Sequence, residues 1–167
     1  GTNKVAAPTG ALVVFGLDGR IRQTVAGIDR PNNVDIEQGV VLNGRTMDLA
    51  ITTERLRHRL RVFEIAADGS GISQVGIVPV LVGQAGDFSE PMGLGLYKRP
   101  SDGVLFAIVA PKRGPASNYL WQYRIDGDGA GGITGTLVRR FGNFSEKAAG
   151  ARAARPTAST GVRTAMP

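Results

Sequence analysis

Short apolar runs recur about every ten positions along the chain, and residues typical of turns separate them. Runs of this length, alternating or continuous, are typical of β-strands, and no segment shows a helical period with capping residues. The pattern therefore predicts an all-β fold. Strands are expected at 11–16, 21–26, 34–42, 46–53, 60–66, 72–79, 93–98, 104–110, 119–125 and 133–141.

Two tight turns are marked by residue types that accept unusual backbone angles. Asn43-Gly44 lies between two expected strands, and both residue types tolerate positive φ, so a two-residue hairpin is predicted there. Ser101-Asp102-Gly103 marks a second tight turn for a similar reason.

Three stretches share one design, in which a strand with an aromatic residue leads through an Asp-Gly turn into a strand that opens with isoleucine. They read "VVFGLDGRI", "VFEIAADGSGI" and "WQYRIDGDGAGGI", and their turn aspartates are Asp18, Asp68 and Asp126. The period of about 50 to 58 residues has room for four strands, which matches the blade of a β-propeller. A β-sandwich with irregular hairpins is the alternative, but it does not predict the spacing of three similar units.

Composition is compatible with one ordinary domain. The chain has 167 residues and is 42% hydrophobic, which is enough to bury a core. The absence of cysteine excludes disulfides, thiolate metal sites and a cysteine nucleophile. No stretch is long and apolar enough to span a bilayer, and no signal peptide is visible. The chain begins with Gly1 rather than methionine, so a processed or truncated start is expected.

The net charge of +6 comes largely from the end of the chain. Four basic residues and no acids occur from Lys147 onward, so the preceding part carries only about +2. We predict a patterned domain at 1–145, followed by an Ala/Arg-rich, disordered tail at 146–167. Nucleic-acid binding by this tail is disfavoured, because aromatic residues do not interleave with its charges.

A basic residue stands shortly before the aromatic strand of each repeat: Lys4 in "TNK", Arg55 in "TTER" and Lys112-Arg113 in "APKR". If the repeats are blades, these residues end on the same face of the disc. Separated cations around a concave face suit a ligand with several phosphates, and Arg55 could bind one of them bidentately. The alternative is that strand ends are solvated and that Lys and Arg are simply common there.

Hard oxygen donors cluster at the entry of the third expected strand. Asn32, Asn33, Asp35 and the carbonyl of Val34 together suit calcium. The alternative is an Asx-type turn that caps the strand.

Other acidic residues carry weaker signals. Asp48 is expected to pair with a turn, whereas Asp87 and Glu90 in "GDFSEP" are expected to be loop residues, with Glu90 a weak ligand candidate.

The remaining candidates argue against common catalytic designs. His58 is the sole histidine, lies among arginines and has no recognisable serine partner, so a Ser-His-Asp site is disfavoured. The "DGDGAGG" stretch lacks both the Lys-Ser/Thr of a phosphate loop and the closing glutamate of an EF-hand. Trp121, Tyr119 and Tyr123 are expected in the core.

The segments "NNVD", "LNGRTMDLAITTER", "EPMGLGLYKRPSDGVLFAIVAPKRG", "YLWQYRIDGDG" and "GTLVRRFGNFS" resemble the β-propeller (alkaline) phytases, in particular their Gram-negative branch. The resemblance runs from about Thr2 to Ser145. It implies a six-bladed propeller, of which this chain would hold about two to three four-stranded antiparallel blades. It also implies a secreted or periplasmic 3-phytase-type phosphatase, a monomer at full length without nucleic-acid or membrane partners. Such an enzyme uses Ca2+ to direct a water onto phytate (myo-inositol hexakisphosphate) or other inositol phosphates, releasing inorganic phosphate.

The resemblance also assigns residues. Lys4, Arg55 and Lys112 match the substrate phosphate-binding positions of the family. Asn33 and the Val34 carbonyl, with the adjacent Asn32, match a calcium-binding segment.

Departures from the family are equally specific. Val5, Met92 and Arg113 stand where other members have a lysine, a tyrosine and a glutamate. The Asp-Asp-Pro segment before Lys4 and the Glu-Ile-Glu-Ala segment after Ser145 are absent, so the expected catalytic carboxylates lie outside this chain. This predicts a weak or inactive fragment, and the alternative is a non-catalytic propeller-like module that binds polyanionic phosphate ligands.

Overall fold

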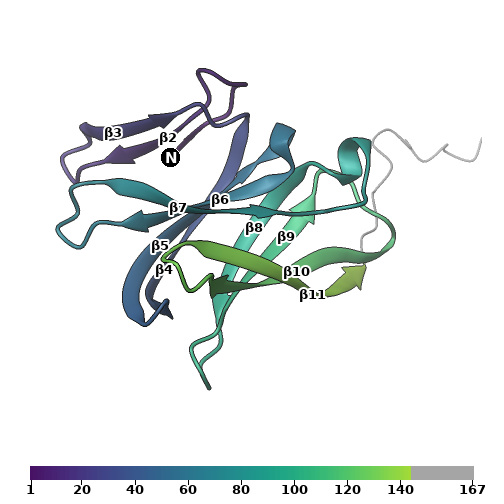
Figure 1. Cartoon of the computed structure of the whole chain (residues 1–167). Helices are drawn as coiled ribbons and strands as arrows, with labels where there is room; N and C mark the ends of the chain where they lie inside the picture. Colours follow the sequence, from purple (N-terminus) through teal and green to yellow (C-terminus); the bar gives the residue numbers. More distant parts are fainter. Residues whose placement is uncertain (144–167) are drawn as a thin grey trace, which may run out of the picture.

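The computed structural model describes residues 1–143, and the predicted tail at 146–167 lies outside the described residues. Nearly all of the regular elements are strands, as Figure 1 shows, so the all-β prediction is confirmed. The strands are β1 (Thr2–Asn3), β2 (Ala11–Phe15), β3 (Ile21–Ala26), β4 (Pro31–Leu42), β5 (Arg45–Glu54), β6 (Arg59–Ile65), β7 (Ile72–Pro79), β8 (Pro91–Lys98), β9 (Leu105–Pro111), β10 (Ser117–Gly127) and β11 (Ile133–Asn143). Two 3-10 turns, η1 (Arg55–Arg57) and η2 (Gly86–Phe88), lie between them.

Strands β4 to β7 and β8 to β11 form two four-stranded antiparallel units that face each other. The last strands of the two units, β7 and β11, meet in parallel where Gly76 pairs with Ile133. At the opposite edge β4 lies against β8, where the Asp35 carboxylate accepts a hydrogen bond of 2.8 Å from the backbone N–H of Leu96. This is the relation expected of neighbouring propeller blades, so the partial-propeller prediction is confirmed.

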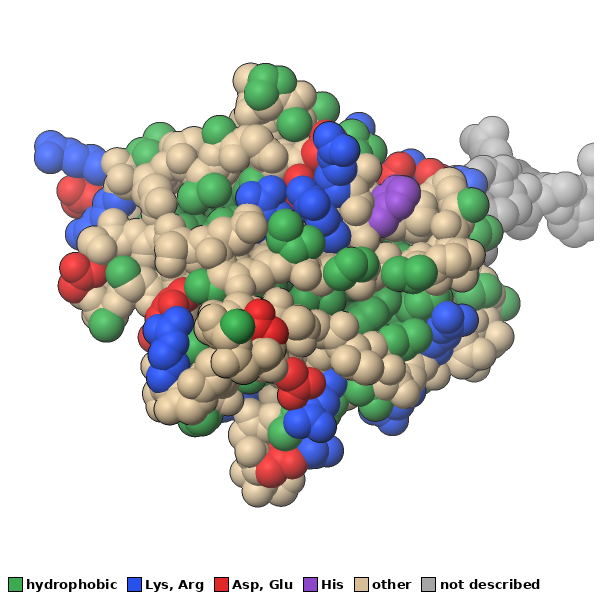
Figure 2. Space-filling model, viewed as in Figure 1, with side chains coloured by type: hydrophobic (Ala, Val, Ile, Leu, Met, Phe, Trp, Pro, Cys, Tyr) green, Lys and Arg blue, Asp and Glu red, His purple; other side chains and the backbone are tan. Residues whose placement is uncertain are grey.

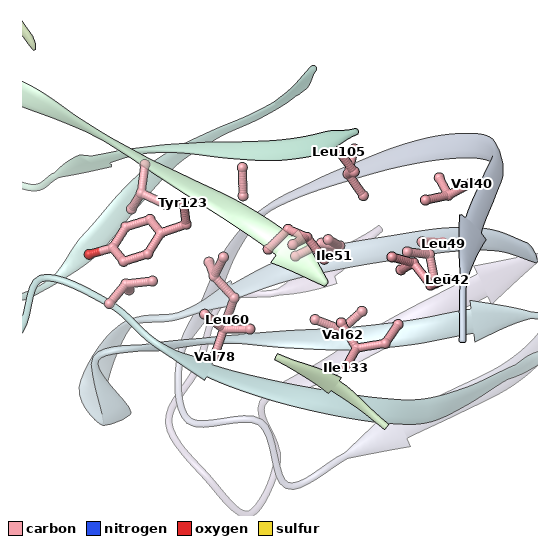
Figure 3. Packing of buried hydrophobic residues seen from close by; sticks show 14 of the residues in the cluster. Val40, Leu42, Leu49, Ile51, Leu60, Val62, Val78, Leu105, Tyr123 and Ile133 are labelled. Atoms are coloured by element: carbon pink, nitrogen blue, oxygen red, sulfur yellow. The ribbon is translucent and has the colours of Figure 1, made fainter. Parts of the chain in front are cut away.

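The main hydrophobic core lies between these two blades. Figure 3 shows the side chains from both blades pointing toward one another. Strand β5 supplies Met47, Leu49 and Ile51 at alternate positions, as a strand with one face in this core must. The other buried members are Val40, Leu42, Leu60, Val62, Val78, Val80, Leu81, Leu105, Ala107, Val109, Trp121, Tyr123, Ile125 and Ile133.

Strands β1 to β3 form a separate small sheet, which packs through a second core cluster made by Leu12, Ile28, Ala50 and Phe63. Strands β2 and β3 flank the first repeat's Asp-Gly turn just as β6 and β7 flank the second. Within the described residues, strand β1 pairs only with the beginning of β2. The described chain therefore contains two complete blades and the outer half of another.

The hairpin predicted at Asn43-Gly44 is present, with φ of 51° and 73° at the two turn residues. The predicted strand boundaries differ from the observed ones at several places. Strand β1 was not predicted, and β4 begins at Pro31 rather than Val34 because Pro31 already pairs with Glu54 across an irregular register. Among residues 1–143, no helix is long and apolar enough to cross a membrane.

Candidate functional site

One rim of the two blades collects the strand ends that carry most of the candidate residues. Strand β4 begins opposite the end of β5, and β8 begins opposite the end of β9. Because these pairs are antiparallel, residues entering β4 and β8 lie at the same rim as residues leaving β5 and β9. Figure 2 shows basic and acidic side chains gathered beside the single histidine.

Arg55 follows β5 directly and is mostly buried, with a side chain only 10% exposed. Its Nη2 forms an ion pair with Oε2 of Glu90, which lies just before β8 on the neighbouring blade. Its Nε is a buried nitrogen that has no hydrogen-bond partner in the described part of the chain. A buried guanidinium with an unused donor is suited to bind an anionic oxygen.

Lys112 follows β9, and its side chain contacts Glu90 and the nearby Asp87. Its Nζ lies 2.8 Å from Oδ1 of Asp87 and 3.8 Å from the Glu90 oxygen that Arg55 also contacts. Arg113 Nε lies 3.7 Å from the other Asp87 oxygen. The hydrogen bond from Lys112 holds the pKa of the Asp87 carboxyl below its usual range, and the charges of Lys112 and Arg113 act in the same direction.

Lys4 lies on the loop after β1 and is exposed. Its neighbour Val5 accepts a hydrogen bond from the backbone N–H of Arg30, and the Arg30 carbonyl accepts one from the backbone N–H of Arg55. Two backbone hydrogen bonds, both made by Arg30, therefore connect the Lys4 segment to Arg55. The structure thus brings Arg55 and Lys112 together on one oxygen atom, whereas Lys4 makes no ion pair within residues 1–143.

A second ionic cluster fixes the turn that carries Arg55. Glu54 is 1% exposed and lies 2.5 Å from Nε of Arg59 and 3.5 Å from Nη1 of Arg61. Its other oxygen accepts a hydrogen bond of 2.7 Å from the backbone N–H of Asp29. Burial raises the pKa of Glu54, but the hydrogen bonds from Arg59 and Asp29 outweigh it and leave the pKa below its usual value.

The predicted calcium-binding residues lie at the same rim, at the start of β4. The backbone carbonyls of Asn32 and Asn33 accept hydroxyl hydrogen bonds from Thr2 and Thr52, and the Asn32 side chain donates to Asn33 Oδ1 and to the Met92 carbonyl. These oxygens keep free lone pairs, so they fit as neutral ligands of a hard cation. No group of three acidic or histidine side chains suited to a metal occurs within residues 1–143, so the fit is that of a partial site.

Asp35, which was grouped with these donors, is used elsewhere. Its carboxylate accepts the backbone N–H groups of Ile36 and Leu96 and so connects β4 to β8. Asp48 accepts the backbone N–H of Gly39, which lies within β4 where the register with β5 shifts, so it pairs with a strand irregularity and not with a turn as predicted.

The structure places a serine beside the histidine, which sequence reasoning missed. Ser89 Oγ lies 3.3 Å from His58 Nε2, and the same hydroxyl donates to the Gly86 carbonyl at 2.8 Å. Because the single hydroxyl proton is given to Gly86, the imidazole must donate to Ser89 rather than accept from it. Ser89 is also 3% exposed, so this pair holds the loop in place and does not form a nucleophile.

Asp87 and Glu90 are the site residues whose importance was underestimated from the sequence. They contact Lys112 and Arg55 only because η2 brings the loop before β8 against the ends of β5 and β9. The "DGDGAGG" loop uses its own backbone N–H groups on Asp128 and Asn43.

Comparison with known proteins gives two findings. The family described as Phytase matches residues 2–154 of the chain. The 3-phytase of Bacillus subtilis (strain 168) is 31% identical over 130 residues, which make up 78% of this chain and 33% of that protein. The chain therefore spans about a third of the length of this curated relative.

Proposed function

The chain belongs to the phytase family, and from this premise we propose that it forms the phosphate-binding part of a calcium-dependent phosphomonoester hydrolase acting on phytate. The observation that carries the proposal is the convergence of Arg55 and Lys112 on one Glu90 oxygen. Cationic groups placed this closely can bind neighbouring phosphates of one ligand. A secreted or periplasmic location, and a monomeric state at full length, belong to the same proposal.

The described residues would divide the work by their chemistry. Arg55 presents a planar guanidinium, which can bind one phosphate through two nitrogens once Glu90 is displaced. Its buried Nε has no hydrogen-bond partner within residues 1–143. Lys112 would contribute a more mobile point charge, since its side chain is 39% exposed. Lys4, on the adjacent loop, can reach a further phosphate group of the same ligand.

Calcium, when bound, would supply charge neutralisation and a water of lowered pKa for attack on phosphorus. The amide and carbonyl oxygens of Asn32, Asn33 and Val34 are its proposed ligands in this chain. The carboxylates that complete such a site are expected outside the described residues. We therefore expect the 167-residue chain alone to release phosphate from phytate weakly or not at all.

A second candidate function is a non-catalytic module that binds polyanionic phosphates. It is favoured by the same cations, together with the absence of a three-acid metal cluster within residues 1–143. The two candidates differ in whether calcium strengthens the binding of the ligand.

Isothermal titration calorimetry with inositol hexakisphosphate, with and without Ca2+, tests both candidates. Arg55→Lys should weaken binding about tenfold, because lysine cannot reproduce the two-nitrogen contact. Arg45→Lys is the matched control, since Arg45 pairs with Glu64 at the other end of β5. Binding strengthened by Ca2+ supports the hydrolase fragment, whereas calcium-independent binding supports the module. Equal effects of the two substitutions, or no binding at all, would refute the assignment of the site.

A further inference from the structure

Two carboxylates lie between the cations that the proposed function assigns to phosphate. We propose that Asp87 and Glu90 are internal counter-ions, which occupy the phosphate positions of Lys112 and Arg55 until the phosphates of a ligand displace them. This inference rests on the proposed function. It adds that the two carboxylates compete with the ligand, so a ligand that binds both cations has to displace both.

The carboxylates are held in place by the fold and are not mobile surface groups. The backbone N–H of Lys112 donates to the Glu90 carbonyl at 2.8 Å, and that of Arg113 donates to the Asp87 carbonyl at 3.2 Å. Between the two acids, Ser89 is buried and its hydroxyl is hydrogen-bonded to the Gly86 carbonyl and His58. The loop therefore presents both acids to the cations in a fixed register.

The two ion pairs differ in strength because they differ in exposure. The side chains of Arg55 and Glu90 are 10% and 19% exposed, so water screens their attraction poorly. Those of Lys112 and Asp87 are 39% and 37% exposed, which makes this pair the weaker one. Glu90 is thus the main competitor for a phosphate at Arg55, and Asp87 is a lesser competitor at Lys112.

Competition of this kind weakens a ligand more when the ligand has to displace more carboxylates. A carboxylate fixed in the fold acts at a high effective concentration, so a lone phosphate that replaces it gains little. A ligand with neighbouring phosphates can engage Arg55 and Lys112 together, and it then displaces both carboxylates. Removing both carboxylates should therefore tighten the binding of inositol hexakisphosphate more than that of inorganic phosphate, which displaces one of them.

The test is a pair of calorimetric titrations, with inorganic phosphate and with inositol hexakisphosphate, at fixed ionic strength. The full chain is compared with Asp87→Asn, Glu90→Gln and the double variant. Glu64→Gln is the matched control, since it also removes one negative charge but pairs with Arg45, about 30 Å away along β5. We expect the double variant to bind inorganic phosphate about tenfold more tightly and inositol hexakisphosphate about a hundredfold more tightly.

The possible results distinguish a failure of this inference from a failure of the proposed function. If the wild-type chain binds inositol hexakisphosphate but the double variant tightens both ligands equally or neither, the inference is wrong and the function stands. If no variant and no wild-type chain binds either ligand, the proposed function itself fails, and the inference fails with it. Should Glu90→Gln not fold, Asp87→Asn alone must still tighten the binding of inositol hexakisphosphate. This variant is expected to fold because both side chains of its ion pair are partly exposed.

Discussion

Glu54→Gln is the substitution whose effect on stability the structure defines most sharply. The side chain of Glu54 is 1% exposed. It accepts hydrogen bonds from Arg59 and from the backbone N–H of Asp29, and it forms an ion pair with Arg61. Glutamine has the same shape and can keep the Asp29 hydrogen bond. However, its NH2 group would face the donating Nε of Arg59, so two donors would oppose each other and two arginines would lose their counter-ion.

The expected cost follows from how far the two arginines are shielded. Removing one partner of a buried ion pair typically costs roughly 3–5 kcal/mol. Arg59 and Arg61 have side chains 30% and 14% exposed, so water can solvate part of the orphaned charge. We therefore expect a loss at the lower end, about 3 kcal/mol of unfolding free energy. Glu64→Gln, which breaks an exposed pair, should cost less than about 1 kcal/mol.

Urea unfolding followed by Trp121 fluorescence measures this difference. With a slope of about 2 kcal/mol per molar, the midpoint of Glu54→Gln should fall by about 1.5 M. The pKa of Glu54 lies below its ordinary value of 4.5, so its stabilising effect is present at neutral pH and disappears as pH falls through the lowered pKa. The loss of stability at low pH that protonation of Glu54 causes should therefore be absent in Glu54→Gln. A loss no larger than that of Glu64→Gln would refute the reasoning.

Two further predictions concern the packing of the blades. In Gly76→Ala the new Cβ would lie 2.5 Å from the carbonyl oxygen of Ile133, so we expect β7 and β11 to be forced apart. The free energy of unfolding, measured in urea, should fall by roughly 1–3 kcal/mol. An unchanged midpoint would contradict this close approach. Burial raises the pKa of Tyr123 to about 12, so in an alkaline titration followed by absorbance this tyrosine should ionise only as the pH approaches 12, and stability should be lost over the same rise in pH. Ionisation of Tyr123 at the ordinary tyrosine pKa of 10.0 in the folded chain would contradict its burial.

The sequence was sufficient for the parts of the fold that local chemistry determines. Strands with regular alternation were found, and the turn at Asn43-Gly44 was predicted correctly because its positive φ angles suit these residue types. The repeat of Asp18, Asp68 and Asp126 identified the blades. Strand β1 was missed because it has two residues, and such a strand carries no periodic signal.

The site was predicted only where the repeat could place it. Arg55 and Lys112 occupy equivalent positions in successive blades. The repeat period was therefore sufficient to predict that they lie at the same rim. The contacts of Asp87 and Glu90 depend on η2, which has no counterpart in the repeat and was not predicted. The Glu54 cluster was missed for a different reason, since a glutamate between a strand and a run of arginines reads as solvated until the fold buries it.

The candidate site therefore depends on the interface between blades and not on any one blade. Arg55 belongs to the blade of β4–β7, whereas Glu90 and Lys112 belong to the blade of β8–β11. Their distance is fixed by the core between the blades, the Asp35–Leu96 hydrogen bond and the contact of β7 with β11. A substitution that loosens this interface without touching the rim should weaken phosphate binding, because two half-sites on separately moving blades lose the advantage of simultaneous contact.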